Sequence, residues 1–122
     1  IQGVKMILYR PVGSKELELI KQSGYTKYPP RLPEQPIFYP VLNEKYANEI
    51  TMKWNVRYGS SQKGYVTKFE IDDEYFMQFE VHTVGNHYHK ELWILAEELE
   101  TFNNHIIGKI QVISKFPVYG NV

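Results

Sequence analysis

The chain has 122 residues, enough for one domain with a single hydrophobic core. Lysine and arginine together number 14, as do aspartate and glutamate, so the formal net charge of zero gives no electrostatic basis for binding nucleic acid or an anionic membrane. The absence of cysteine excludes a disulfide scaffold and a thiolate metal site.

The sequence shows no targeting signal or membrane-spanning segment. No apolar run approaches the roughly 20 residues needed to cross a bilayer, and no basic-then-apolar leader ends in small residues. We therefore expect a cytoplasmic protein that does not bind membranes. Met6 opens the first patterned segment, so residues 1–5 are interpreted as an expression remnant. Without an internal repeat or a domain boundary, residues 1–122 are expected to form one domain.

The chain begins with a predicted buried strand and a helix. Residues 6–9 are a compact apolar run, which the punctuating residues Pro11 and Gly13 close. Ser14 is a candidate helix cap because its hydroxyl can accept from backbone N–H groups of the first turn, and Gly24 is a credible stop.

An irregular segment and a second helix follow. Residues 25–36 include four prolines, which remove backbone donors and bias the preceding residues away from helix. This stretch is expected to be extended and to form one wall of a groove. Residues 37–39 make a short strand at best. Asn43 is the expected cap of a helix that runs to about Trp54 and has one apolar face at helical spacing.

The second half of the chain is predicted to be mainly strands. Residues 58–64 are a Gly/Ser loop, and residues 65–71 then alternate as in a strand with one buried face. The remaining elements are expected to be a helical turn, a strand, the strand that carries Glu91, a helix and a last strand, over residues 72–74, 79–83, 89–95, 96–105 and 109–116. Helices early and strands late favour an α+β fold over repeated βαβ units.

Glu91 is the leading candidate for chemistry. It lies where the polar loop 85–88 becomes a short apolar strand, and a carboxylate at such a point can be held rigidly beside a cleft. The competing interpretation is a solvated charge at the edge of a strand, as most carboxylates are surface residues.

Arginine and histidine side chains offer further candidates. Arg10 follows the first predicted strand and has a forked donor suited to phosphate, but it could equally pair with a neighbouring carboxylate. Zinc accepts histidine and carboxylate ligands, and the sequence places His82, His87 and His89 close to Glu91. Their loop lacks the helical spacing that fixes such ligands, so we expect hydrogen-bonding histidines and no metal site.

The aromatic residues Phe38, Tyr39, Tyr46 and Trp54 are expected to be core residues or a platform on which a flat heterocycle stacks. The sequence contains no Gly-rich phosphate loop, G-x-S-x-G elbow or H-E-x-x-H motif, which argues against those enzyme classes.

The order of these segments resembles the small bacterial ADP-ribosyltransferase-like domains, including toxin-type modules. The resemblance covers nearly the whole chain. Four pieces carry it. The first strand with its arginine and the following helix correspond to residues 7–13 and 15–17, and the aromatic strand end with its helix to residues 38–39 and 43–54. A core strand corresponds to residues 64–71, and the strand of the catalytic glutamate with the segments after it to residues 91–94, 96–99 and 107–110.

The resemblance implies an α+β fold with helices early and a mainly antiparallel split sheet around an NAD cleft. It implies that Glu91 is catalytic and stabilises an oxocarbenium-like ribose when the nicotinamide bond breaks. It assigns binding of NAD, the substrate, to Arg10, Tyr39, Phe38, Tyr46 and His89. The acceptor would be a protein or another macromolecule in a transferase, or water in a hydrolase. Arg10, Tyr39 and Glu91 are therefore expected to line one cleft.

Two departures bear on activity. Members that modify arginine carry a second glutamate two residues before the catalytic one, where this chain has His89, and the Ser-Thr-Ser strand of one subgroup is replaced by Phe38-Tyr39-Pro40. Arginine is therefore not expected as the target. The main alternative is a catalytically inactive nucleotide- or protein-binding module on the same fold, and a glycan hydrolase pairing Glu91 with Glu70 or Glu80 is a third reading.

Overall fold

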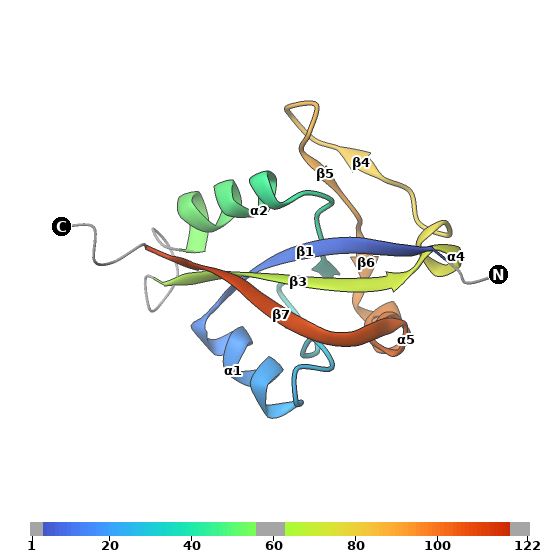
Figure 1. Cartoon of the computed structure of the whole chain (residues 1–122), viewed down its shortest axis with the longest axis horizontal. Coiled ribbons are helices and arrows are strands. Elements are labelled where there is room, and N and C mark those ends of the chain that lie inside the picture. Colours follow the sequence, from blue (N-terminus) through green and yellow to red (C-terminus); the bar gives the residue numbers. More distant parts are fainter. Residues whose placement is uncertain (1–3, 56–62, 118–122) are drawn as a thin grey trace.

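A three-stranded antiparallel sheet in the order β1-β3-β7 forms the middle of the protein (Figure 1). Its strands are β1 (Lys5–Gly13), β3 (Gly64–Asp72) and β7 (Ile106–Phe116). The computed structural model describes residues 4–55 and 63–117, so most of the loop predicted over 58–64 lies outside the described residues. The mixture of helices and antiparallel sheets makes the fold α+β, as predicted from the order of the elements.

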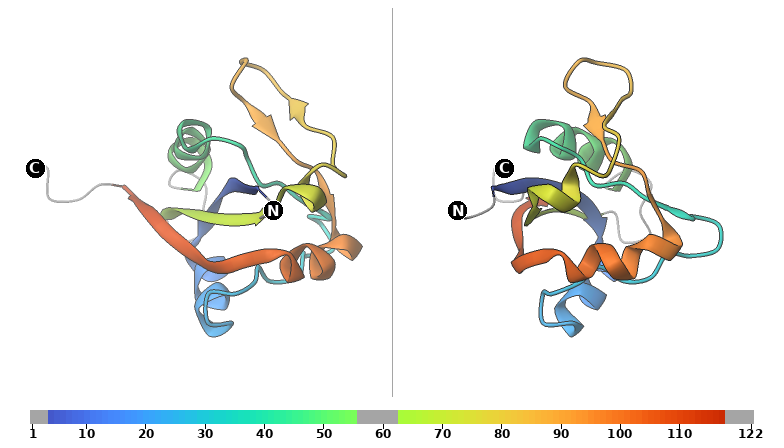
Figure 2. Two further views of the ribbon diagram at one scale, coloured as in Figure 1. Left: turned by 45° about the vertical axis from the view of Figure 1, so that its right-hand side comes forward. Right: turned by 90° about the vertical axis from the view of Figure 1, so that its right-hand side faces the viewer.

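Helices lie on both sides of this sheet. In Figures 1 and 2, α1 and α2 are separated by the strands. The bounds are α1 (Ser14–Gln22), α2 (Glu44–Ile50), α4 (Asp73–Phe76) and α5 (Leu99–Asn104), with a π-helical turn η1 (Thr51–Asn55) after α2 and a 3₁₀ turn η2 (Ala96–Glu98) before α5. Within residues 4–55 and 63–117, no helix is long and apolar enough to cross a membrane.

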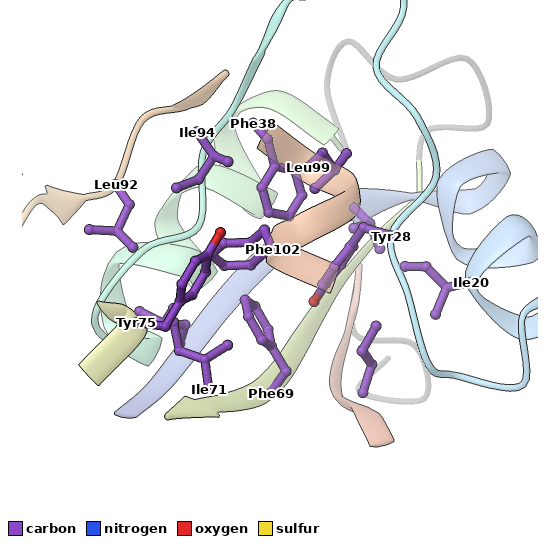
Figure 3. Close-up of a cluster of buried hydrophobic side chains, with 13 residues drawn as sticks. Ile20, Tyr28, Phe38, Phe69, Ile71, Tyr75, Leu92, Ile94, Leu99 and Phe102 are labelled. Carbon is purple, nitrogen blue, oxygen red and sulfur yellow. The ribbon is translucent and has the colours of Figure 1, made fainter. Parts of the chain in front are cut away.

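Strand alternation divides the buried side chains into two clusters. Leu8 of β1 and Phe69 of β3 face the larger cluster, whereas Val66 of β3 faces a smaller one beneath α2, with Ala47. Figure 3 shows the larger cluster, in which aromatic rings from distant segments meet edge to face. Phe102 of α5 is fully buried there. The core therefore fixes α1, α5 and the sheet against one another.

The first strand differs from the predicted one. It continues through Pro11 to Gly13 instead of ending after residue 9, and it begins at Lys5, which pairs with Asp72. Because β1 is the outer strand of the three-stranded sheet, a residue without an N–H group can be accommodated there. The pairing makes Lys5 part of the central sheet, whereas residues 1–3 of the predicted remnant lie outside the described residues.

Two helix boundaries and the last strand also bear on the predictions. Asn43 is the N-cap of α2, as predicted, whereas α1 begins at Ser14 itself after an N-cap at Gly13. Gly24 ends the first helical region with a positive φ of 76°. Gly108 does not precede β7 but lies inside it, with a φ of 69°, where the pairing with β3 shifts register. It forms a bulge, which is where a strand tolerates such a φ.

Residues 37–42 run antiparallel to residues 90–95 in one constant register. The pairing starts between β2 (Ile37–Phe38) and β6 (Ile94–Leu95), and it is resumed where Val41 pairs with Glu91 of β5 (Lys90–Glu91). The strand predicted over 89–95 is therefore two short strands. Opposite Leu92 stands Pro40, which accepts from the Leu92 N–H at 2.9 Å but has no N–H to return, and the regular ladder is interrupted there.

This strand pair joins the central sheet to a hairpin. Val41 pairs with Tyr9 of β1 on one side and with Glu91 on the other. Glu91 in turn pairs with His82 of β4 (His82–Thr83). The strand predicted over residues 79–83 is therefore only two residues long. The β4–β5 hairpin projects from the body of the protein (Figure 2). One cross-strand row thus contains Tyr9, Val41, Glu91 and His82.

Candidate functional site

A cavity of about 760 Å³ lies beside the strand pair formed by residues 37–42 and 90–95. The face of this pair that carries Tyr39, Val41, Glu91 and Trp93 lines the cavity, whereas alternate residues such as Phe38 point into the core. Among the described residues, the lining consists of Arg10, Pro11, Glu16, Arg31, Glu34, Gln35, Pro36, Ile37, Tyr39, Val41, Tyr46, Ile50, Glu91 and Trp93.

Glu91 is held by a hydrogen bond to each carboxylate oxygen. The Tyr46 hydroxyl donates to Oε2 at 2.8 Å, and the Trp93 indole Nε1–H donates to Oε1 at 2.7 Å. Glu91 is only 8% exposed. Burial, and then the hydrogen bond to Glu91, raises the pKa of Tyr46 above its ordinary value, so the hydroxyl stays a donor. The carboxylate consequently has one orientation at the cavity wall.

A histidine ring stacks on each of the two donors to Glu91. His89 lies 4.3 Å from the Tyr46 ring centroid at an angle of 14°, and its Nε2 is 3.0 Å from Oε1 of Glu49. His82 lies 3.6 Å from the Trp93 ring centroid at 3°. Neither imidazole is among the groups that line the cavity. Both histidines therefore contact Tyr46 and Trp93, the two donors to Glu91, without lining the cavity.

Arg10 is buried at the cavity wall, where two side chains hold its guanidinium group. Its Nε and Nη2 donate to the two oxygens of Glu16 at 2.8 and 3.0 Å, and its guanidinium carbon lies 4.6 Å from the centroid of the Phe38 ring. Burial alone would lower the pKa of Arg10, but the Glu16 carboxylate outweighs it and the pKa is raised. The pair uses two of the five N–H donors of a guanidinium.

The main chain of Arg10 is also anchored. The Thr67 hydroxyl donates to the Arg10 carbonyl oxygen at 2.8 Å, and the Tyr28 hydroxyl lies 2.8 Å from the same Thr67 oxygen. Because the Thr67 proton is already used, Tyr28 is the donor of the second bond. Burial raises the pKa of Tyr28, which keeps this proton in place. The linked hydroxyl groups of Tyr28 and Thr67 thus connect the proline-rich segment, residues 25–36, to β1 at Arg10.

The proline-rich segment contributes a second cation, Arg31. Its Nε donates to the Gln35 carbonyl oxygen at 3.1 Å. Partial burial, and then the positive charge of Arg10, lower the pKa of Arg31. Two guanidinium groups close enough to repel each other face one cavity, and an anion bound between them would relieve that repulsion.

The structure brings Arg10, Tyr39, Tyr46 and Glu91 together at one cavity, so the expectation that Arg10, Tyr39 and Glu91 share a cleft is met. Tyr39 is 41% exposed and can be reached by a ligand. The expectation for Phe38 is corrected, since it is fully buried and supports Arg10 from the core. His89 is likewise displaced from the cavity, because Tyr46 lies between them.

Of the charged and aromatic residues that line the cavity, Glu16, Arg31, Glu34 and Trp93 were not among the site residues predicted from the sequence. Arg10 and Glu16 are separated only by the end of β1 and the first turn of α1, and such a pair could have been sought. Trp93 lies two positions after Glu91, which places both side chains on one face of an extended segment. Alternation was the available signal for Trp93, and none identified Arg31.

The remaining candidates do not form a second site of this kind. Among the described residues, no group of three or more histidine and carboxylate side chains is arranged to hold a metal ion. Another hollow, of about 710 Å³, lies between α1, the proline-rich segment and α5. Its charged lining residues, Lys27 and Glu100, are both exposed. The charged side chains that are buried among the described residues, Arg10 and Glu91, therefore both lie at the Glu91 cavity.

Comparison of the chain with protein-family models, with curated proteins and with solved structures found no match.

Proposed function

We propose that the protein uses NAD as a substrate, breaks its nicotinamide–ribose bond and transfers ADP-ribose to an acceptor or to water. One observation carries this proposal. A buried carboxylate, Glu91, is fixed by two hydrogen bonds in the same cavity as two guanidinium groups, those of Arg10 and Arg31. The substrate that suits it has a negative part for the arginines and a part that becomes positive beside the carboxylate.

The size and lining of the cavity suit a dinucleotide. Its volume, about 760 Å³, lies within the range of roughly 300–1,000 Å³ common for small-molecule sites. Arg10 and Arg31 are suited to the pyrophosphate because guanidinium groups donate in a fixed fork to phosphate oxygens. Tyr39 and Trp93, both near half exposed, are suited to stacking on the flat nicotinamide ring.

Glu91 would act on the bond-breaking step. The bond between C1′ of the ribose and the ring nitrogen breaks, and its electron pair leaves with nicotinamide, which becomes neutral. The ribose then carries the positive charge of an oxocarbenium ion, the charge type also formed in glycoside hydrolysis. A prepositioned carboxylate stabilises that charge without reorganising. The acceptor oxygen, nitrogen or sulfur atom bonds to C1′ and its proton is lost to solvent.

The glycan hydrolase reading has less support. Glycosidases of the common type need two carboxyl groups across one bond, about 5–10 Å apart. Neither Glu70 nor Glu80 is among the described residues that line the cavity. Of the other carboxylates there, Glu16 is engaged by Arg10, and Glu34 is exposed instead of buried in the wall. One buried carboxylate, Glu91, in a cavity with two arginines is better suited to NAD.

The test is nicotinamide release from NAD by the wild type and by Glu91→Gln, with calorimetric NAD titration and thermal melts of both. Glutamine keeps the shape but not the charge, so we expect turnover to fall by about 10²–10³ while NAD binding persists. Glu70→Gln, which neutralises a carboxylate outside the cavity, is the matched control and should retain wild-type turnover.

Three results would change the proposal. Equal release by wild type and Glu91→Gln would remove Glu91 from the reaction. NAD binding by the wild type without release of nicotinamide, across a range of acceptors, would favour a nucleotide-binding module. Absence of NAD binding would end both readings.

A further inference from the structure

Trp93 is an unusual donor to Glu91 because its indole is partly in solvent. It is 44% exposed, so little of the surrounding protein restricts its ring. Yet its Nε1–H bond to Glu91 is 2.7 Å, which requires the indole plane to be held at one angle. Some contact must supply that restraint.

His82 supplies the contact. Its ring lies parallel to the indole, with centroids 3.6 Å apart and an interplanar angle of 3°. His82 is also the direct cross-strand partner of Glu91 in the β4–β5 hairpin. Side chains paired in this way project from the same face, about 4.5–5.5 Å apart at Cβ. One backbone pairing therefore places His82 beside Glu91, and one ring contact places it against Glu91's donor.

We propose that His82 is a positioning residue that orients the Trp93 indole toward Glu91, and so aligns the carboxylate for the reaction proposed above, on which the activity part of this inference rests. His82 is not among the described residues that line the cavity, so it acts through Trp93 and does not touch substrate. The role requires a flat ring at position 82 and not the ionisation of an imidazole.

A structural readout that needs no activity tests the first half of the proposal. The chain has two tryptophans, so a proton–nitrogen spectrum contains two indole N–H signals, and Trp93→Phe identifies the one from Trp93. A hydrogen bond to a carboxylate shifts this signal downfield and slows its exchange with solvent. His82→Leu should move it toward the position of a solvent-exposed indole and speed its exchange. His82→Phe, which keeps a flat ring, should leave it near the wild-type position.

The kinetic readout tests the second half. At metal sites, residues that orient a functional ligand typically contribute about 10- to 100-fold to activity. We expect His82→Leu to lose about tenfold in kcat, near the lower end of that range, with an unchanged KM for NAD. His82→Phe should retain activity within about twofold of wild type, because a ring stacked on the indole is preserved. In His82→Leu/Trp93→Phe the two losses should not add, because both changes remove the same contact.

His87→Ala is the matched control. His87 lies in the same hairpin, where its contacts are with Asn86 and Tyr88, and its removal should change neither the Trp93 signal nor kcat. The proposal is overturned if His82→Leu leaves the Trp93 signal and kcat unchanged, or if His82→Phe loses as much as His82→Leu. A wild type that fails to release nicotinamide would instead refute the proposed function, while the Trp93 signal would still decide the role of His82.

Discussion

Tyr46 and Glu91 are joined by a hydrogen bond of 2.8 Å across 45 positions of the chain, which ties helix α2 to strand β5. Tyr46 lies in the first turn of α2, directly after the residues that start the helix. The orientation of Glu91 therefore depends on where α2 begins as well as on the strand that carries the glutamate.

Tyr46→Phe should lower activity more than stability. The variant keeps the ring that stacks on His89 but removes the donor to Glu91. A hydrogen bond to a charged group contributes about 1.5–3 kcal/mol, so we expect roughly a 10- to 100-fold loss of nicotinamide release if that bond is used in the transition state. Chemical denaturation measures the cost in folding free energy. Full activity in a folded Tyr46→Phe protein would show that this bond is not used.

Asn43 offers a way to disturb Tyr46 without touching the site. Its Oδ1 accepts from the Tyr46 backbone N–H at 2.8 Å, and its Nδ2 donates to the Tyr88 carbonyl oxygen. Asn43→Ala should cost about 0.5–2 kcal/mol of folding free energy, the usual cost of losing an N-cap, and should also reduce turnover. Asn43→Asp keeps the cap but not the bond to Tyr88, so denaturation curves of both variants separate the two contributions. Equal stability of Asn43→Ala and wild type would contradict the capping role.

Arg10→Lys should weaken NAD binding although it conserves charge. Lysine cannot reproduce the two-pronged bond to Glu16 or present a planar fork to a phosphate. Loss of one charged hydrogen bond, about 1.5–3 kcal/mol, corresponds to roughly a 10- to 100-fold increase in Kd, measured by calorimetric titration. Lys68→Arg, at a half-buried position of β3 that does not line the cavity, is a control for the exchange of the two cations. An unchanged Kd would exclude Arg10 from the NAD site.

Asp72 should make the folded state sensitive to acid. A contact of 2.9 Å with His105 Nδ1, and then the Tyr75 backbone N–H, lower the pKa of Asp72. Because the folded pKa lies below the unfolded value of about 3.9, the resulting stability is complete above that value and is lost as pH falls through the folded pKa. The window is therefore below about pH 4.

Asp72→Asn isolates this contribution, because asparagine can still cap α4 but does not titrate. Thermal melts between about pH 6 and 2 should show a smaller loss of Tm for Asp72→Asn than for wild type. Asp73→Asn makes the same change in net charge at the next position and should retain the wild-type slope. Parallel acid profiles for wild type and Asp72→Asn would contradict the prediction.

Local pattern predicted those parts of the fold that local physics decides. The alternation of residues 65–71 identified β3 because its two faces meet different surroundings, and Asn43 identified the start of α2 because capping involves neighbouring residues. Tyr28 was not recognised as a core residue, since it lies in a segment without periodicity and its hydroxyl partner, Thr67, is 39 positions away.

The same distinction applies to the site. Arg10 and Glu91 stand out because each is a charged residue beside an apolar run, which the sequence displays directly. The place of His89 could not be predicted, because Tyr46 and Glu49 of another element determine where its ring lies. Phe38 could have been separated from Tyr39 by alternation alone, had the strand been extended to Leu42.

The backbone hydrogen bond that Pro40 cannot donate has a consequence for the wall of the cavity. On one side of Pro40, β2 and β6 form a regular ladder, and on the other side Val41 is bonded to Tyr9 and paired with Glu91. Between these anchors the two segments share the Leu92–Pro40 bond, and there Tyr39 faces Trp93 in the common register. The backbone ladder is therefore weakest where these two aromatic residues lie, so the position of Trp93 there depends more on its side-chain contacts with Glu91 and His82 than on backbone pairing.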